Sequence, residues 1–276
     1  NVTRRNFRFT YWLFSCMSLV MLISSVVLAV RIGTDKRLPF FLADLHLYTE
    51  YFFLGSPMGI QLAGALECCF LVLVATAMLI VVLFTFQKTV SAEIHLIALW
   101  IFLVEAEALR LPMLIMAQRS PSISSLISLT RLVYGARFSG LISLFISGLY
   151  AVGIGKEKPQ TGYLFALLLG SMFAMLLPIS IDRFQSSFML QAGYSELTMI
   201  VTASLIILNA IDYFVAARLK EDRSYAFVGI ALTAAAASWV WLWETRVFEW
   251  GLIVVIAFVL CVFASIKILH HVYIWK

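Results

Sequence analysis

The sequence predicts an all-α, polytopic integral membrane protein: a bundle of eight transmembrane helices with both termini in the cytoplasm. Apolar residues make up 62% of the 276 residues, while charged residues make up 13%, about half of their share in a soluble domain. The apolar residues gather in windows of about 20 or more, the length that a helix needs to cross the hydrocarbon core. The composition therefore excludes a soluble globular domain, a disordered tail and a disulfide scaffold.

Charged residues, or Pro and Gly, separate the apolar windows, and each window is predicted to form one membrane-spanning helix. Together they make a single bundle over residues 1–276. Several windows exceed the minimum span, so we expect some helices to tilt. The predicted helices are 10–31, 58–87, 91–117, 122–152, 162–182, 192–217, 225–244 and 249–271.

Residues 32–57 form the one long loop between these helices, on the outer side. The loop is rich in aromatic residues, which favour the membrane interface. Its 38–53 part is predicted to be a short helix on the membrane surface. It is the only outer segment long enough to cap a cavity in the bundle.

The second, third and fourth helices carry ionisable residues, and these form the main candidate site. An ionisable group in the hydrocarbon region costs several kcal/mol on insertion scales, so each one is a candidate functional residue. The helical rise places Glu67, Glu107 and Arg131 at nearly the same depth in the outer half, which predicts pairing of Glu107 with Arg131. The candidate ligand-binding or ion-pair residues are Glu67, Glu105, Glu107, Arg110, Arg131, Tyr134 and Arg137.

Two interpretations of this network stay open. It is either a self-satisfied structural network that fixes the register of the helices, or a polar cavity for a ligand, an ion or a proton. For the cavity we predict an apolar-bodied, polar-headed small molecule beneath loop 38–53. Arg131 or Arg110 would hold its head group, and Tyr48 or Phe52 would contact its body.

The remaining helices add one further polar locus. Serines and glycines recur along the fourth helix and predict close packing of neighbouring helices. Pro178 lies near the outer end of the fifth helix. The second polar locus consists of Asn209 and Asp212 on the sixth helix and Lys267 on the eighth, with Asp212 expected to pair with Lys267 or to face water.

Aromatic residues and cysteines receive simpler interpretations. Trp239, Trp241, Trp243 and Trp250 flank the outer ends of the last two helices and are predicted to form an aromatic belt. All four cysteines fall within apolar windows, where they are expected to be small buried residues.

The distribution of basic residues predicts the orientation. With the N-terminus in the cytoplasm, eleven Lys and Arg residues fall inside and six outside, which favours cytoplasmic termini. This rule accounts for the net charge of +5, so no nucleic-acid partner is expected. The predicted location is an integral, multi-pass position in the bacterial inner membrane.

Three functions compete on this evidence. The favoured one is a sensory or ligand-binding module in the membrane that passes a signal to a cytoplasmic output domain or partner. Its layout looks like that of the multi-span input regions of bacterial signalling proteins, which is an analogy of layout only. The alternatives are a small transporter or channel that uses the Glu/Arg network, and a non-catalytic subunit of a larger membrane complex.

Enzymatic activity is the least favoured class. The sequence contains no phosphate-binding G-x-x-x-x-G-K-[ST], no G-x-S-x-G and no H-E-x-x-H. It also lacks Cys and His at metal-ligand spacing. No catalytic residue, metal or cofactor is therefore expected. The predicted partners are the lipid bilayer, a small amphipathic ligand, and a cytoplasmic output domain or a membrane partner subunit.

Overall fold

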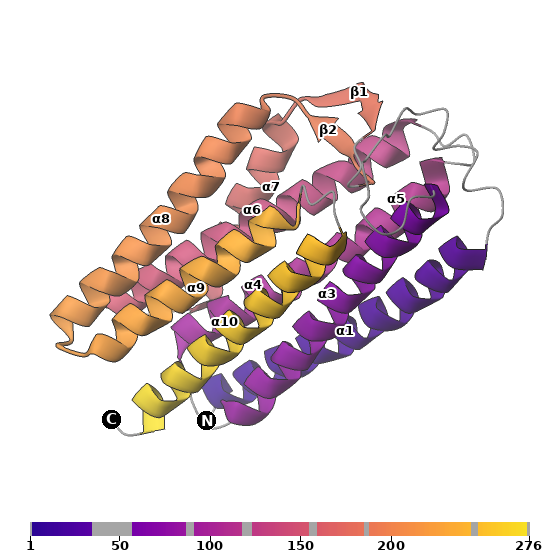
Figure 1. The fold of residues 1–276 in the computed structure, drawn as a ribbon. Helices are drawn as coiled ribbons and strands as arrows, with labels where there is room; N and C mark the ends of the chain where they lie inside the picture. Colours follow the sequence, from indigo (N-terminus) through magenta and orange to yellow (C-terminus); the bar gives the residue numbers. More distant parts are fainter. Residues whose placement is uncertain are drawn as a thin grey trace.

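The protein is a bundle of long helices with one β-hairpin at one end (Figure 1). The computed structural model describes residues 2–34, 57–86, 91–117, 123–154, 159–184, 188–243 and 248–274. Its elements, in chain order, are α1 (Val2–Thr34), α3 (Pro57–Thr85), α4 (Ala92–Val104), the 3₁₀ helix η1 (Glu105–Leu109), α5 (Arg110–Ala117), α6 (Ile123–Val152), α7 (Pro159–Leu176), β1 (Ile179–Phe184), β2 (Leu190–Ala192), α8 (Ser195–Leu219), α9 (Arg223–Trp241) and α10 (Phe248–Ile274).

The helical, multi-pass character of the chain is confirmed. Among the described residues, six helices are long and apolar enough to cross a membrane: α1, α3, α6, α8, α9 and α10. The apolar helix α7 is shorter, and α4, η1 and α5 follow one another without a break within 92–117. Each of the eight predicted windows thus corresponds to helical structure.

The third window is not the uninterrupted α-helix that was predicted. Its middle turns are a 3₁₀ helix, η1, in which the backbone is wound more tightly. A 3₁₀ stretch within a longer helix often marks a hinge or a strained segment. Two of the three acidic residues of this window, Glu105 and Glu107, lie in η1.

The predicted limits of the fifth and sixth helices are wrong at the point where they approach each other. Helix α7 ends before Pro178, and residues 179–184 and 190–192 form an antiparallel hairpin instead of helix. Proline disfavours a helical conformation in the residue before it. The amide of Gly193 then donates a hydrogen bond of 2.7 Å to the carbonyl of Pro178, which closes the base of the hairpin.

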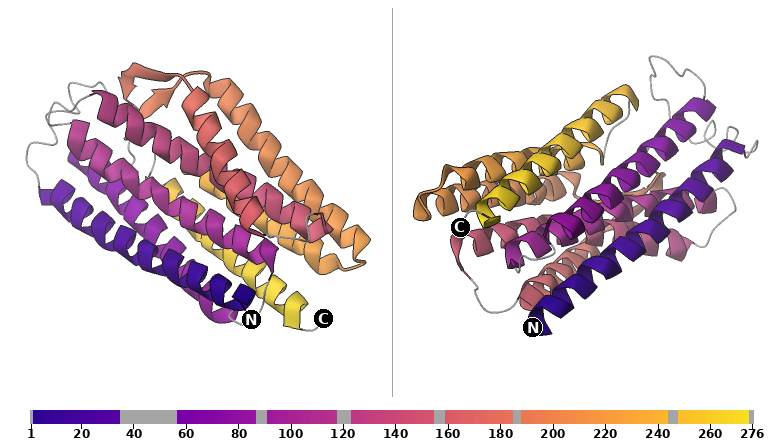
Figure 2. Two further views of the ribbon diagram at one scale, coloured as in Figure 1. Left: turned by 180° about the vertical axis from the view of Figure 1, so that it is seen from behind. Right: turned by 90° about the horizontal axis from the view of Figure 1, so that it is seen from below.

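Helix α6 occupies the centre of the bundle. It packs against α4, α7 and α8, while α9 and α10 pack against each other and α1 packs against α3 (Figure 2). The largest hydrophobic cluster joins α3, α4, α9 and α10 around the buried Trp100 and Trp239. A second cluster joins α6, α7 and the hairpin.

Both chain ends and the turn between α8 and α9 lie at one end of the bundle, while the hairpin lies at the other (Figure 1). The hairpin inserts Phe188 between α3 and α5, where its ring is buried against Gly64, Leu111 and Leu114. Phe188 has a φ of 61°, a left-handed conformation that is strained for a bulky residue. The predicted surface helix 38–53, with Tyr48 and Phe52, lies outside the described residues.

Candidate functional site

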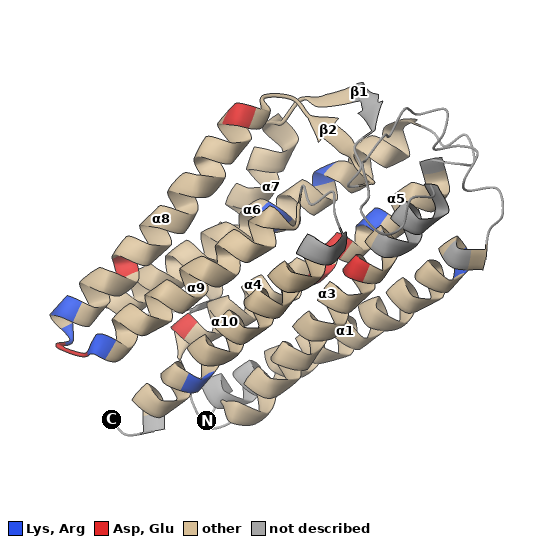
Figure 3. Ribbon diagram, in the orientation of Figure 1, with Lys and Arg blue, Asp and Glu red and all other residues tan. Residues whose placement is uncertain are grey.

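One group of acidic and basic residues gathers on the hairpin side of the bundle, near one end of α10 (Figure 3). Their centre is Glu107 of η1. Its Oε1 accepts a hydrogen bond of 2.7 Å from Arg137 Nε, and its Oε2 accepts one of 2.8 Å from Arg137 Nη2. Arg110 Nη1 donates a third, of 3.3 Å, to Oε2. Arg137, and not Arg131, is therefore the arginine of α6 that pairs with Glu107.

Aromatic rings enclose this ion pair on its other side. The Arg137 guanidinium lies 4.5 Å from the ring centre of Trp243 and 5.3 Å from that of Tyr134. Glu107 is 2% exposed and Arg137 is 3% exposed, so the pair is shielded from solvent and lipid. Shielding strengthens both the ion pair and the cation–π contacts.

Glu67 of α3 extends this cluster to α10. Its carboxylate lies against Gly251, about 3.0 Å from the position that a Cβ on this glycine would take. Arg110 is close enough to attract Glu67 as well as Glu107. We define the ion-pair cluster as Glu67, Glu107, Arg110 and Arg137, whose formal charges sum to zero.

Glu105 lies apart from the ion-pair cluster. It accepts hydrogen bonds from Ser18 of α1 and from Thr76 of α3, the latter at 3.4 Å. Its second oxygen, Oε2, is buried and has no hydrogen-bond partner among the described residues. The two glutamates of η1 thus bind different helices: Glu105 binds α1 and α3, and Glu107 binds α6.

A groove runs along the side of the bundle, bordered by α1, α4, η1, α6 and α7, with a cavity volume of about 450 Å³. Leu132 and Met175 line it and are exposed on the surface of the bundle, so the groove opens sideways toward lipid. Its apolar walls include Met21, Leu109, Leu132 and Met175, and its polar residues are Glu105, Ser128, Arg131, Ser139 and Ser171. We call it the lateral groove.

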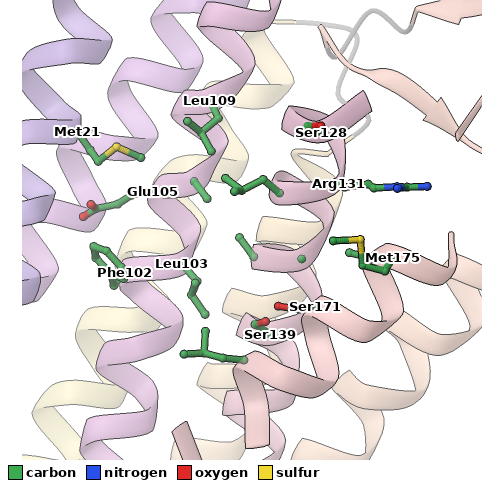
Figure 4. Close-up of a pocket in the computed structure, with 16 residues that line it drawn as sticks. Met21, Phe102, Leu103, Glu105, Leu109, Ser128, Arg131, Ser139, Ser171 and Met175 are labelled. Atoms are coloured by element: carbon green, nitrogen blue, oxygen red, sulfur yellow. The ribbon is translucent and has the colours of Figure 1, made fainter. Parts of the chain in front are cut away.

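Glu105 and Arg131 stand on opposite walls of the lateral groove and point away from each other (Figure 4). Arg131 is partly exposed, and its buried Nε has no hydrogen-bond partner within the described ranges. Of the seven predicted residues, the structure therefore brings five together: Glu67, Glu107, Arg110, Tyr134 and Arg137. It leaves Glu105 and Arg131 at the groove.

The second predicted locus is only partly assembled. Asn209 and Asp212 share the face of α8 that packs on α6, where Asp212 lies directly against Gly148. Lys267 is exposed on α10, which packs on α9 and α3. The structure does not bring Lys267 to Asp212, and the Oδ2 of Asp212 has no hydrogen-bond partner in the described part of the chain.

A third polar cluster lies at the end of the bundle that holds the termini, and the sequence analysis missed it. Buried Glu93 of α4 accepts a hydrogen bond of 2.7 Å from the hydroxyl of Tyr273 on α10. The same hydroxyl is 2.9 Å from Ser91 Oγ. Nearby, Tyr11 of α1 stacks on His95 of α4. These contacts connect the first, third and last helices of the bundle.

The predicted aromatic belt is wrong for two of its tryptophans. Trp239 and Trp243 are buried in the core, whereas Trp241 is 66% exposed. Residues four apart on a helix share a face, and a residue two apart from each does not. This spacing was the signal that could have assigned Trp239 and Trp243 to the interior and Trp243 to the ion-pair cluster.

Within the described residues, no three His, Cys, Asp or Glu side chains gather in a way that could hold a metal ion. Comparison of the chain with protein-family models, with curated proteins and with solved structures finds no match.

Proposed function

We propose that this chain is a sensory module of the membrane, which binds an amphipathic small molecule in the lateral groove and relays its presence along α10. One observation carries the proposal: η1 borders the lateral groove and also holds the ion-pair cluster. Glu105, Ala106 and Leu109 line the groove, while Glu107 binds Arg137. A ligand that contacts η1 would therefore act on the ion-pair cluster directly.

The composition of the lateral groove suggests the class of ligand. Ligand pockets are mostly apolar, with a few polar groups that fix the orientation of the ligand. Arg131, at the edge of the groove, would bind an anionic head group with its guanidinium, and the leucines and methionines would contact an apolar body. A long-chain fatty acid has this chemistry and reaches the groove from the bilayer.

The relay would pass from η1 to the last two helices. Arg137 contacts Trp243 directly after α9, and Glu67 lies against Gly251 of α10. A change in the winding of η1 would alter both contacts. Since α10 extends from Gly251 to the end of the bundle that holds both termini, its movement would carry the signal there.

The proposed function also requires a particular membrane topology. We propose that all eight helical segments cross the membrane, with both termini on the cytoplasmic side. The location is the inner membrane of a bacterium, on the layout analogy given above. An output domain or partner on that side would receive the signal.

A photoreactive fatty acid tests the proposal on the full chain in lipid nanodiscs. Labelling is expected to concentrate on η1 and on α7 around Met175, and excess unlabelled fatty acid should suppress it. Ser171→Leu fills the groove from α7 and should lower this labelling several-fold. Ser204→Leu is the matched control because Ser204 is an exposed serine of α8 outside the groove. Labelling spread evenly over the lipid-facing helices, and unchanged by Ser171→Leu, would contradict the proposal.

A further inference from the structure

Glu105 of η1 is a fully buried carboxyl group that the ion-pair cluster does not include. Its side chain is 0% exposed. Its Oε1 accepts hydrogen bonds from the hydroxyls of Ser18 and Thr76, which also lie 2.8 Å from each other. Its Oε2 has no hydrogen-bond partner in the part of the chain that the structure describes. Buried polar groups in native proteins are almost always satisfied, so this oxygen requires an explanation.

Glu107, two residues further along η1, shows how a buried carboxylate is neutralised in this bundle. It is as deeply buried as Glu105, and it accepts three hydrogen bonds from two arginines. Glu105 accepts its two hydrogen bonds from neutral hydroxyls. An ionised Glu105 would therefore be a buried charge without a counter-ion, and a carboxyl in such a place takes up a proton instead.

The arginines of the helices around η1 do not supply the missing counter-ion. Arg110 and Arg137 bind Glu107, and Arg131 points away from Glu105 across the lateral groove (Figure 4). Among the described residues, Glu105 makes no ion pair. The other titratable groups that these helices turn toward the interior are Tyr11 of α1, Glu67 and Cys68 of α3, Glu93 and His95 of α4, and Tyr134 of α6.

A row of polar side chains on α1 leads to Glu105 from the end of the bundle that holds the termini. Tyr11, Ser15 and Ser18 are all buried, and their spacing of four and three residues places them on one face of α1. Tyr11 stacks on His95 of α4 at the start of the row, and Ser18 binds Glu105 at its end. The Oγ of Ser15, between them, has no hydrogen-bond partner within the described ranges.

We propose that Glu105 is a proton-binding site in the interior of the membrane, which protons reach along the Tyr11, Ser15 and Ser18 face of α1. Glu105 lies midway along the segment 92–117, about 20 Å from either end, and intramembrane carboxyls at such depth mark proton relays. The bound proton neutralises the carboxylate, and its release would favour a conformation that admits water or a counter-ion to η1. Both a pH-dependent sensor and a proton-driven transporter could use this site, which does not depend on a ligand in the lateral groove.

Infrared spectroscopy of the full chain in lipid nanodiscs tests the site. The carbonyl stretch of a protonated carboxyl lies above the backbone amide I band, where few other groups of a protein absorb. Glu105→Gln keeps the shape of the side chain and removes the acid. The difference between the wild-type and Glu105→Gln spectra should contain this band at neutral pH, and the band should disappear as the pH rises.

Two serine variants test the surroundings of the carboxyl. Ser18→Ala removes a hydrogen bond that favours the ionised form, so the band should persist to a higher pH than in the wild type. Ser15→Ala interrupts the polar row and should slow the exchange of the Glu105 proton into heavy water several-fold. Ser24→Ala is the control, because Ser24 is an exposed serine of α1 whose hydroxyl bonds to its own helix. It should behave as wild type does.

Two results would overturn this proposal. A difference spectrum without the carboxyl band at neutral pH would show that Glu105 is ionised and binds no proton there. Equal exchange rates in the wild type and in Ser15→Ala would refute the route along α1. The spectra are recorded without fatty acid, and the photolabelling of the lateral groove is measured at one pH, so the failure of either proposal leaves the other standing.

Discussion

Arg131 and Arg137 are the same residue type on the same helix, yet their environments differ completely. Six positions on an α-helix correspond to a rotation of about 240°, so the two side chains leave α6 from different faces. Arg137 enters the core and binds Glu107, whereas Arg131 borders the lateral groove. Depth alone predicted the wrong partner because it ignores the rotation of each helix about its axis.

Because of this difference, the stability of the Arg137→Ala and Arg131→Ala variants can be compared directly. Arg137→Ala leaves Glu107 buried without its bidentate partner, and removal of one member of a buried pair costs on the order of 3 kcal/mol. Arg131→Ala should cost about 0.5 kcal/mol or less, because Arg131 makes no ion pair with any of the residues that the structure describes. Unfolding in denaturing detergent measures both. Equal losses would show that Arg137 and Glu107 are not coupled in the membrane.

The start of α9 provides a second test at a single residue. The Asp222 carboxylate accepts a hydrogen bond of 2.9 Å from the amide of Ser224, which caps the helix. Asp222→Ala should destabilise the protein by about 1 kcal/mol, while Asp222→Asn, which keeps the acceptor, should be nearly neutral. The same unfolding assay measures both variants. An Asn variant as unstable as the Ala variant would point to the charge instead of the cap.

At the scale of elements, the close approach of α6 and α7 depends on Gly170. A Cβ on Gly170 would lie 2.6 Å from the Cα of Ser139, and this backbone cannot move away cheaply. Gly170→Ala should therefore destabilise the protein by about 2 kcal/mol, the usual cost of overpacking. Gly135 also faces α7, but its Cβ would meet Ala174 at an ordinary 3.6 Å.

Gly135→Ala is accordingly the matched control and should leave the thermal midpoint of the purified chain nearly unchanged. The two variants add the same methyl group to opposite sides of the same interface. If both were tolerated, α6 and α7 would pack less tightly in the membrane than the structure shows.

The sequence predicts the helices well and their interruptions poorly. Apolar windows predict long helices because hydrocarbon demands internal hydrogen bonding over a fixed length. The hairpin was missed because Ile179 and Ile181 continue the apolar window past Pro178. Nothing in the apolar pattern of 91–117 distinguishes the 3₁₀ turns at 105–109, which depend on how α1, α3 and α6 surround them.

The residues of the candidate site could be predicted from the sequence, but which of them pair with one another could not. Intramembrane charges are conspicuous in an apolar chain, and five of the seven predicted residues do meet. Their pairing depends on tilt and rotation, which only packing decides. Trp243 and Gly251, which complete the surroundings of the cluster, carry no charge, so Trp243 was assigned to the aromatic belt and Gly251 to no site.

For the molecule as a whole, the positions of the turns between helices at the two ends of the bundle predict how the chain is oriented in the membrane. Ile154 after α6 and Glu221 between α8 and α9 lie at the end that holds both termini, and Tyr194 lies at the hairpin end (Figure 1). Single cysteines at Ile154 and Glu221, in a chain whose native cysteines are replaced, should react with an impermeant maleimide only in inside-out vesicles. The proposed topology, which is based on the excess of basic residues, puts this end in the cytoplasm.

A cysteine at Tyr194 is expected to show the opposite accessibility. Labelling of all three positions from the same side would refute the single crossings, by α7 and by α8, that separate Tyr194 from Ile154 and from Glu221. Reversed labelling of all three would leave the bundle intact but exchange its two sides.

The buried tryptophans have an optical consequence. The rings of Trp239 and Trp243 are 5.3 Å apart and nearly perpendicular, at 87°, and Trp100 lies 6.2 Å from Trp239. At such separations the electronic transitions of neighbouring indoles couple, and the coupled bands acquire circular dichroism of opposite sign. Because Arg137 rests on Trp243, any motion of the ion pair would alter that signal. The chain thus carries its own chromophore, which makes the state of its interior readable without a label.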